Sequence, residues 1–258
     1  MISLRGESNN RSLERAIHLL LVMADAKQPM RLKDLSEITQ IPKPSILRLL
    51  SVLEKYNFCK KSHNRFYLGM VFLPIAYSFL IGNELARISL PILQELVQSS
   101  NETASLFARL GSDRILLQRV NGPYPLRYTL PIGQRLPLHL GIGKVLLTAF
   151  PDDELMQLIK KVGSHKLANG KLITPKMLFN NIENIRRDGY VISRGERTIG
   201  AGSVAAPVID SCGSTIAAVA LSGNADRMNL KRLKLLSIEV MGAANAISER
   251  LGGSLQLI

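Results

Sequence analysis

The stretch that decides the fold is IPKPSILRLLSVLEKYNFCKKSHNRFY, residues 41–67. Its pattern predicts one short amphipathic helix followed by a small hairpin. The stretch holds six basic residues and one acidic residue, a net charge of +5 over 27 residues. A basic helix face followed by a basic hairpin fits the major groove of DNA and its flanking phosphates. The stretch therefore favours a nucleic-acid-binding protein over an enzyme.

The predicted helix has two distinct sides, because successive side chains of a helix are turned by about 100°. One side is apolar and suits a core, whereas Arg48 and Lys55 lie on the opposite side. The planar guanidinium of Arg48 suits a guanine edge or a phosphate, and Lys55 suits a phosphate. A solvated helix face is the alternative for these two charges alone. The predicted apolar stripe is Ile46, Leu49, Leu50 and Leu53, and the candidate DNA-binding residues are Lys43, Pro44, Ser45, Arg48, Ser51, Lys55, Lys60, Lys61 and Arg65.

Two further helices are predicted before this stretch. Ser12 is expected to cap a helix over residues 13–26, and Gln28-Pro29 ends it. A short strand at Met30-Arg31 and a helix over residues 32–39, with Leu35 and Ile38 inward, lead to the basic helix. This order, with the hairpin after it, is that of a winged helix-turn-helix. The expected inward residues of the first helix are Leu13, Ala16, Ile17, Leu20, Met23 and Ala24, and those of the hairpin are Phe58 and Phe66, with Lys60, Lys61, His63 and Arg65 on or near its tip.

Composition limits the alternatives. The chain has 258 residues, is 46% hydrophobic and carries a net charge of +13, which suits a polyanionic partner. The charge is spread over both halves, so the local charge of residues 41–67 is the stronger signal. Cys59 and Cys212 are too few for a disulfide framework or a zinc site, and the four histidines show no metal-ligand spacing. We expect free thiols, no metal, no cofactor, no signal peptide and no membrane span, and hence a cytoplasmic protein.

The second half has a mixed pattern. Residues 69–82 are apolar on nearly every side, which predicts a helix that packs on a partner or within its own chain. Beyond them, helices are expected over residues 84–99, 141–150, 153–161, 175–188 and 229–251, and strands over 104–110, 114–120, 126–130, 190–197, 203–209 and 215–222. This order predicts an α+β domain.

The sequence resembles the IclR family of bacterial transcription regulators. The motifs that carry this resemblance are SLERAIHLLLVM (12–23), LKDLSEITQIPKPSILRLLSVLEKYNF (32–58), FYLG (66–69), RLPLHLGIGKVLLTAF (135–150), IRRDGYVISRGERTIGAGSVAAPV (185–208) and AAVALSG (217–223). It covers roughly residues 12 to 250. The resemblance implies a flexible N-terminus (1–11), a winged helix-turn-helix domain (12–68), a linker helix (69–82) and a GAF-like effector-binding domain with an antiparallel sheet (83–254). It also implies a homodimer or homotetramer on pseudo-palindromic double-stranded DNA.

A loop before a helix is the candidate effector site. In residues 137–144, Gly141 and Gly143 let backbone amides approach a ligand, and free N–H groups at a helix start favour a carboxylate. The alternative is that these glycines only mark the start of the helix, where glycine is common without any role in binding. Given the resemblance, the candidate effector-binding residues are His139, Leu140, Gly141, Gly143, Lys144, Glu196, Ser203, Ala220 and Ser222. Ser193-Arg194-Gly195 and Leu140-Gly141 depart from the family pattern and leave the identity of the effector open. A small organic acid is expected, with an aromatic acid or a sugar-acid derivative equally open.

Three classes of function are compatible with these patterns. The first is a DNA-binding regulator with a small-molecule sensor, for which the resemblance favours repression over activation. The second is an enzyme in the second half, using Glu196, His139 and Ser203, but the sequence has no nucleophile elbow, phosphate loop or metal set. The third is a protein-binding module, which the basic helix and hairpin oppose. We therefore predict the regulator, with no catalytic residues.

Overall fold

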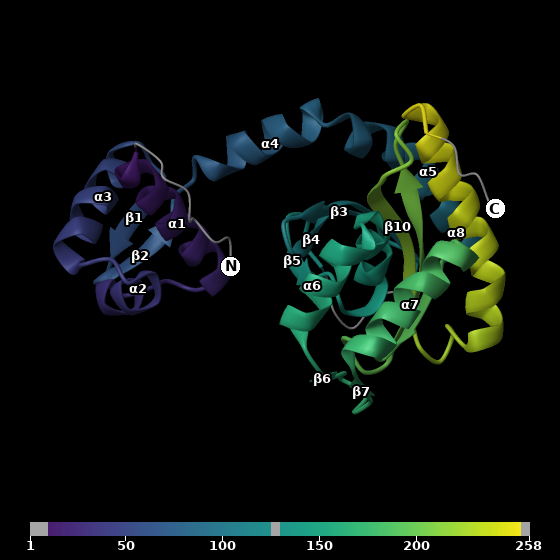
Figure 1. Ribbon diagram of the computed structural model, residues 1–258. Coiled ribbons are helices and arrows are strands. Elements are labelled where there is room, and N and C mark those ends of the chain that lie inside the picture. The colour runs from purple at the N-terminus through teal and green to yellow at the C-terminus, as the bar shows by residue number, and fades with distance from the viewer. Residues whose placement is uncertain (1–9, 125–129, 254–258) are drawn as a thin grey trace. The chain divides into compact units, whose positions relative to one another are not determined.

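The structure is a computed structural model that describes residues 10–124 and 130–253. The chain divides into two compact units between Gly82 and Asn83. The first unit contains α1 (Arg11–Ala26), α2 (Leu32–Thr39), α3 (Lys43–Lys55), β1 (Cys59–Ser62), β2 (Arg65–Leu68) and α4 (Phe72–Gly82). Strands β1 and β2 pair antiparallel, and Met30 bridges to Phe66 of β2 (Figure 1). The predicted winged helix-turn-helix is confirmed.

The core of the first unit forms where α1, α2 and α3 meet the hairpin. Leu19, Leu35 and Ile46, one from each helix, are completely buried. Phe66 anchors the hairpin in this core, as expected from the sequence. Phe58 is only half-buried, and its ring packs edge-on against Phe72 of α4 with 5.4 Å between centroids. The core residues thereby fix which side of α3 faces outward.

Three predictions about the first two helices were wrong. The side chain of Asn10, and not that of Ser12, caps α1 by accepting from the Leu13 N–H. The inward face of α1 is turned. Leu19 is buried together with the predicted Met23, whereas Leu13 and Ile17 are 55% and 44% exposed and Ala24 is exposed as well. Apolar residues occupy both sides of α1, so periodicity alone could not select the side that packs on α2 and α3. In α2, Ile38 is likewise 52% exposed rather than inward.

The second unit is built on a six-stranded antiparallel sheet. Its strand order is β5-β4-β3-β10-β9-β8. The sheet strands are β3 (Thr103–Leu110), β4 (Asp113–Val120), β5 (Arg135–Pro137), β8 (Val191–Arg194), β9 (Ala201–Ile209) and β10 (Thr215–Asn224). The helices are α5 (Glu84–Ser100), the 3₁₀ helix η1 (Gly141–Ala149), α6 (Asp152–Val162), α7 (Pro175–Asp188) and α8 (Leu230–Arg250), and a separate hairpin pairs β6 (His165–Lys166) with β7 (Leu172–Ile173).

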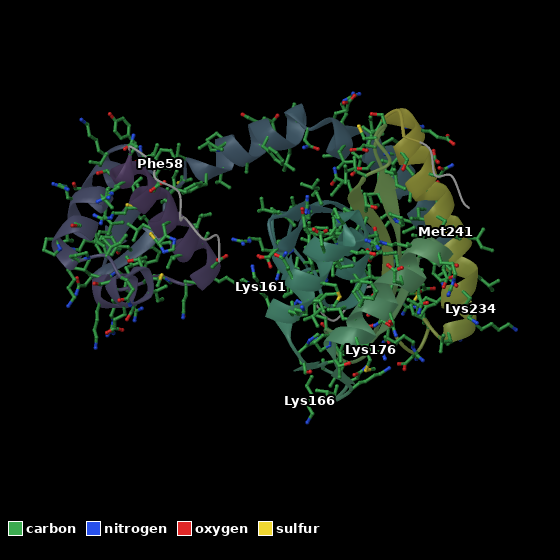
Figure 2. The ribbon with its side chains drawn as sticks, in the orientation of Figure 1. Phe58, Lys161, Lys166, Lys176, Lys234 and Met241 are labelled. Atoms are coloured by element: carbon green, nitrogen blue, oxygen red, sulfur yellow. The ribbon has the colours of Figure 1, made fainter. Side chains whose placement is uncertain are left out.

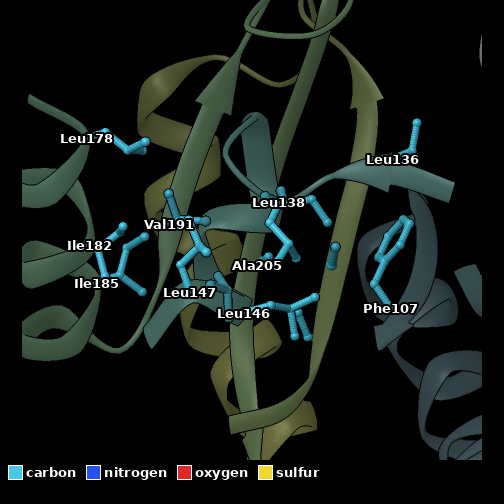
Figure 3. Close-up of a cluster of buried hydrophobic side chains, with 14 of the residues drawn as sticks. Phe107, Leu136, Leu138, Leu146, Leu147, Leu178, Ile182, Ile185, Val191 and Ala205 are labelled. Carbon is cyan, nitrogen blue, oxygen red and sulfur yellow. The ribbon is translucent and has the colours of Figure 1, made fainter. Parts of the chain in front are cut away.

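The sheet is buried on both faces. Leu106 of β3 packs in a cluster with residues of α5 and α8, whereas its neighbour Phe107 packs in a second cluster with residues of η1 and α7. Successive residues of a strand point to opposite faces, so one strand serves both cores. Figure 3 shows the second cluster, with Leu146 of η1 and Ile182 of α7 beside the strands. The α+β class predicted from the sequence is confirmed.

Several expected elements differ in detail. The strand expected over 190–197 ends at Arg194, because the chain turns at Gly195 with a φ of 63°. The helix expected over 141–150 is a 3₁₀ helix, and β5, β6 and β7 were not predicted. In the expected strand 126–130, residues 126–129 lie outside the described residues and Leu130 is not in a strand. Most of the N-terminal segment 1–11 also lies outside them, although Arg11 is already helical.

Helix α4 differs from the other helices because it has no buried residue. Its exposed apolar side chains include Leu73, Tyr77 and Phe79, which are 67%, 66% and 54% exposed. Among the described residues, no helix is both long and apolar enough to cross a bilayer. The apolar surface of α4 therefore requires another explanation, which is given below.

The two cysteines are both free thiols. Cys59 is buried and Cys212 is exposed. Burial, with a smaller effect from the charge of Glu54, raises the pKa of the Cys59 thiol from 9.0 to about 11. Cys59 thus remains protonated and serves as a small apolar side chain of the first core.

Candidate DNA-binding face and effector site

Helix α3 presents a basic surface because its other side is fixed in the core. Ile46 and Leu50 are 0% and 2% exposed. Arg48, Ser51 and Lys55 follow the opposite side and are exposed, as the sequence predicted. Arg48 forms no ion pair with any residue that the structure describes, so its guanidinium is available for a guanine or a phosphate.

The ends of α3 carry the other candidates on this helix. Pro44 lies in the first turn, beside Lys43, and both are exposed, whereas Ser45 is half-buried. The hydroxyl of Ser51 donates to the Arg48 carbonyl at 2.9 Å, which leaves its oxygen as an acceptor. These positions surround Arg48 on the outward side of the helix.

The wing extends the basic surface beyond α3. Lys60 and Lys61 of β1 are exposed, and the turn between the strands contains His63 and Asn64 with φ values of 46° and 57°. The backbone N–H of Lys61 donates to Oε1 of Glu54 at 2.9 Å, which ties β1 to the end of α3. The two ammonium groups are therefore held on the same small scaffold as the outward face of α3.

Arg65 has a structural contact that its sequence position did not reveal. It is half-buried, and its Nη1 donates to the carbonyl of Pro29 at 3.0 Å. That bond links β2 to the turn between α1 and α2. Arg65 thus supports the wing at its base, in contrast to Lys60 and Lys61.

Leu47 is a surface residue of α3 that the list of candidates omitted. Its side chain is 44% exposed and lies next to Arg48 in sequence. A thymine methyl group in the major groove is a natural partner for such a side chain. An exposed leucine on the outward side of a basic helix was the available signal in the sequence.

In the second unit, three serines form a row across the sheet. Ser203 of β9 lies opposite both Ser193 of β8 and Ser222 of β10. Directly opposed residues of antiparallel strands point to the same face. All three line a small cavity of about 40 Å³ under the start of η1, called the inner cavity here. Gly141 and Glu196 of the predicted effector site line it as well.

An ion pair between the buried Lys144 and Glu196 lies beside the inner cavity, which Glu196 lines. Nζ of Lys144 lies 2.9 Å from both carboxylate oxygens of Glu196, and the Lys144 side chain is 6% exposed. The Gly141 N–H also donates to Oε2 of Glu196 at 3.1 Å. The sequence pattern predicted that these donors would meet the carboxylate of a ligand. In this structure an internal carboxylate occupies them.

Arg114 is a component of the site that sequence reasoning missed. It is 2% exposed, lines the inner cavity and donates from Nη1 to the carbonyls of Pro137 and Leu140 at 2.8 and 2.7 Å. A Cβ at Gly143 would overlap this guanidinium, so Gly143 is needed for the approach of Arg114 rather than of a ligand. The signal in the sequence was a charged residue at an inward position of a strand, two residues before the buried Leu116.

The remaining candidates lie outside the lining of the inner cavity. Ala220 is completely buried in the core beside η1. Leu140 contributes its carbonyl to Arg114. The ring of His139 packs edge-on against that of His165, with 4.8 Å between centroids. Burial, followed by the charges of His165 and Arg114, lowers the pKa of His139, and Asp113 partly opposes this.

No group of three or more His, Cys, Asp and Glu side chains among the described residues could hold a metal ion. The second unit brings together hydroxyls, a guanidinium and an ion pair, which suit recognition of a small polar molecule. The first unit offers cations on a protruding helix and wing.

Comparison with known proteins matches two parts of the chain to family models. Residues 12–61 match the IclR helix-turn-helix domain, and residues 78–249 match the C-terminal domain of the bacterial transcriptional regulator IclR. The HTH-type transcriptional repressor AllR of Escherichia coli K12 is 27% identical over 244 residues, which are 93% of this chain and 90% of AllR. AllR of Salmonella typhimurium LT2 has the same identity and coverage.

Solved structures share the fold over nearly the whole length. A transcriptional regulator from Rhodococcus sp. RHA1 has a TM-score of 0.75 and 28% identity, over 93% of this chain and 98% of that one. An IclR homologue from Microbacterium hydrocarbonoxydans, solved in complex with 4-hydroxybenzoate, has a TM-score of 0.74 and 21% identity with the same coverage of both chains.

Proposed function

The chain belongs to the IclR family of bacterial transcriptional regulators, and from this premise we propose that it is a repressor whose operator binding is modulated by a small organic acid. The family is one of regulators rather than of enzymes. The observation that carries the proposal is the outward face of α3, where Arg48 is exposed opposite a buried Ile46 and Leu50. Repression is proposed because the AllR relatives are named as repressors.

We propose that α3 enters the major groove and that the wing contacts the flanking backbone. Arg48 reads a guanine, Leu47 contacts a thymine methyl group, and Lys60 with Lys61 neutralises phosphates. Arg65 keeps the wing in place through its bond to the Pro29 carbonyl. This division of labour follows the general rule that phosphate contacts position a protein and base contacts specify the sequence.

The apolar surface of α4 supports a homo-oligomer. Met70 and Ile81, on either side of the exposed residues named above, are 77% and 60% exposed, and so large an apolar surface is rarely left in water. We propose that α4, together with the exposed Leu13 and Ile17 of α1, packs on a second copy. Two copies supply two recognition helices, which suits a pseudo-palindromic operator. Because a bacterial operator lies on the chromosome, we propose that the protein is located in the cytoplasm.

The effector is proposed to bind at the inner cavity. Its carboxylate is recognised by cations of the lining such as Arg114, and its other polar groups are recognised by the row of Ser193, Ser203 and Ser222. The structural relative that holds 4-hydroxybenzoate is consistent with an aromatic or other small carboxylic acid. The inner cavity of about 40 Å³ is smaller than a typical ligand site, so binding requires the site to open.

Selection of sheared genomic DNA by the purified protein tests the proposal. Arg48→Ala is run beside the wild type, with Arg15→Ala as a matched control because Arg15 is an exposed arginine of α1 outside the proposed face. We expect a few palindromic sites for the wild type and the control, and blurred or lost sites for Arg48→Ala. Uniform or absent recovery for all three proteins, with and without candidate organic acids, would refute sequence-specific binding.

Operator affinity and transcription are then measured with the genes beside the recovered sites. A repressor lowers expression of a reporter that carries its site, whereas an activator raises it. The organic acid that modulates binding is sought among the substrates of the neighbouring genes. A saturating acid that binds the protein but leaves operator affinity unchanged contradicts the switch for that acid.

A further inference from the structure

A second cavity of about 360 Å³ lies beside the inner cavity and is called the outer cavity here. It is formed between α7, β8 and the β6–β7 hairpin, and its lining includes Lys171, Asn181, Asn184 and Arg194. Of the predicted effector residues, only Lys144 and Glu196 reach it. Its volume lies within the range of small-molecule sites, unlike that of the inner cavity.

The charges around the outer cavity leave an excess of positive charge. Lys144 is neutralised by Glu196, and Asp188 accepts from Arg187 at 2.8 and 3.2 Å. Lys171 and Arg194 also line the cavity, and neither forms an ion pair with a residue in the described part of the chain. Two cations without an acidic partner favour an anionic ligand, and Arg194 can bind a carboxylate with two parallel hydrogen bonds.

Besides Asp188, helix α7 contributes two uncharged amides to the lining. Asn181 and Asn184 are three residues apart on α7 and therefore lie on the same side of the helix. Each amide offers both a donor and an acceptor, which suits hydroxyl groups. Ile185 and Val191 add an apolar part to the lining. We propose that the outer cavity is a binding site for a small carboxylate that carries several hydroxyl groups.

The cations of this site are positioned by a network of hydrogen bonds. The side chain of Asn169 accepts from the Lys171 N–H at 3.1 Å and donates to the Arg194 carbonyl at 3.2 Å. The Ala168 N–H donates to the Glu196 carbonyl at 2.8 Å. The turn of the β6–β7 hairpin is thus attached to the end of β8, which brings the backbones of Lys171 and Arg194 together. The site is formed before a ligand arrives.

Glu196 connects the two cavities, since its side chain lines both of them. A carboxylate in the outer cavity competes with Glu196 for the ammonium of Lys144, which lines the outer cavity too. Occupation of the outer cavity thereby loosens a wall of the inner one. The site goes beyond the proposed effector site and does not depend on DNA binding.

The test measures binding of D-gluconate to the full chain by isothermal titration calorimetry in the absence of DNA. D-Glucitol, which has the same hydroxylated chain without a carboxylate, is the matched uncharged compound. Asn181→Asp places a negative charge in the cavity, and Asn180→Asp places it on the next residue of α7, outside the lining. We expect saturable gluconate binding to the wild type and to Asn180→Asp. The affinity for gluconate should fall at least tenfold in Asn181→Asp, and glucitol should not bind.

A second pair of variants guards against an effect of Asn181→Asp on folding. Lys171→Glu reverses a charge of the cavity, and Lys166→Glu reverses one on the same hairpin whose side chain points outward (Figure 2). Only Lys171→Glu is expected to lose gluconate. Absence of binding to the wild type, equal binding of glucitol, or equal affinities within both pairs would overturn the site. None of these results bears on the operator, so the proposed function is tested separately.

Discussion

The outward face of α3 and the Lys144–Glu196 pair are both charged, yet they differ in what their charges do. Arg48 is exposed and forms no ion pair with a described residue. The Lys144 side chain is 6% exposed, and its Nζ lies 2.9 Å from both carboxylate oxygens of Glu196. The first region is held by the apolar side of its own helix and offers its charges to a partner. In the second region the charged groups hold one another.

This difference separates function from stability. Removal of an exposed charge changes binding and leaves the fold nearly unaffected. Removal of one member of a buried pair leaves the other charge without compensation in an apolar environment. The two regions should therefore respond to substitution in opposite ways, and the following variants test this from the largest expected effect to the smallest.

Lys144→Met should cause the largest change. It leaves the partly buried Glu196 carboxylate with the Gly141 N–H as its remaining described partner, at an expected cost of about 3 kcal/mol in the free energy of unfolding. Urea denaturation followed by circular dichroism measures this loss, and Lys176→Met serves as the control because Lys176 is an exposed lysine of α7 (Figure 2). A loss no greater than that of the control would show that the pair does not hold the site.

A double variant sharpens the same comparison. Lys144→Met with Glu196→Met removes both charges, so it should recover part of the stability lost in Lys144→Met. An additive loss in the double variant would contradict a direct interaction between the two side chains. No such recovery is expected for any pair of residues on the outward face of α3.

Arg48→Ala is expected to lower operator affinity by about 1–3 kcal/mol if its guanidinium binds a guanine. Stability should change by less than about 0.5 kcal/mol, because the side chain is exposed. Fluorescence anisotropy with the recovered operator and a scrambled duplex measures the affinities over a range of salt concentrations. A uniform loss for both duplexes, with a salt slope lower by about one, would instead identify a phosphate contact.

The same contrast explains what the sequence predicted. The outward face of α3 was predictable because the helix period places Ile46 and Leu50 together and turns Arg48 away from them. The order of helices and hairpin, the sheet-forming segments and the α+β class were likewise predictable from local patterns. The inward side of α1 was not, because Leu13 and Ile17 are as apolar as the buried Leu19 and only tertiary packing separates them.

The second region was harder for a physical reason. Gly141, Lys144 and Glu196 were all selected, but the sequence could not show that Glu196 occupies the donors of the other two, because 52 residues separate Lys144 from Glu196. The role of Gly143 depends on Arg114, which arrives from a different strand. Contacts between distant segments have no local pattern, so buried sites of this kind are only partly predictable.

Arg65→Ala tests a residue that stands between the two classes. It loses the bond from Nη1 to the Pro29 carbonyl, and because Arg65 is half-buried we expect a loss of about 1 kcal/mol in the stability of the first unit. Thermal unfolding of Arg65→Ala and of the exposed Lys60→Ala compares the two sides of the wing. If only Lys60→Ala is destabilised, the assignment of Arg65 to support of the wing is wrong.

The pH-dependent contribution of His139 to stability should be the smallest of these effects, because water screens the charge of a half-buried ring. Burial, then the charges of His165 and Arg114, lowers its pKa below 6.5 in the folded protein, with Asp113 opposing. Between that lowered pKa and 6.5 the unfolded chain binds more protons, so the contribution of His139 to stability is present above pH 6.5 and is lost as the pH falls.

His139→Gln removes this contribution. When urea unfolding is measured from pH 7.5 to 5, the free energy of unfolding should therefore decline less steeply in the variant than in the wild type. An equal decline in both proteins would mean that the imidazole is as easily protonated in the fold as in water, and that the surroundings of His139 are more open than its contact with His165 indicates.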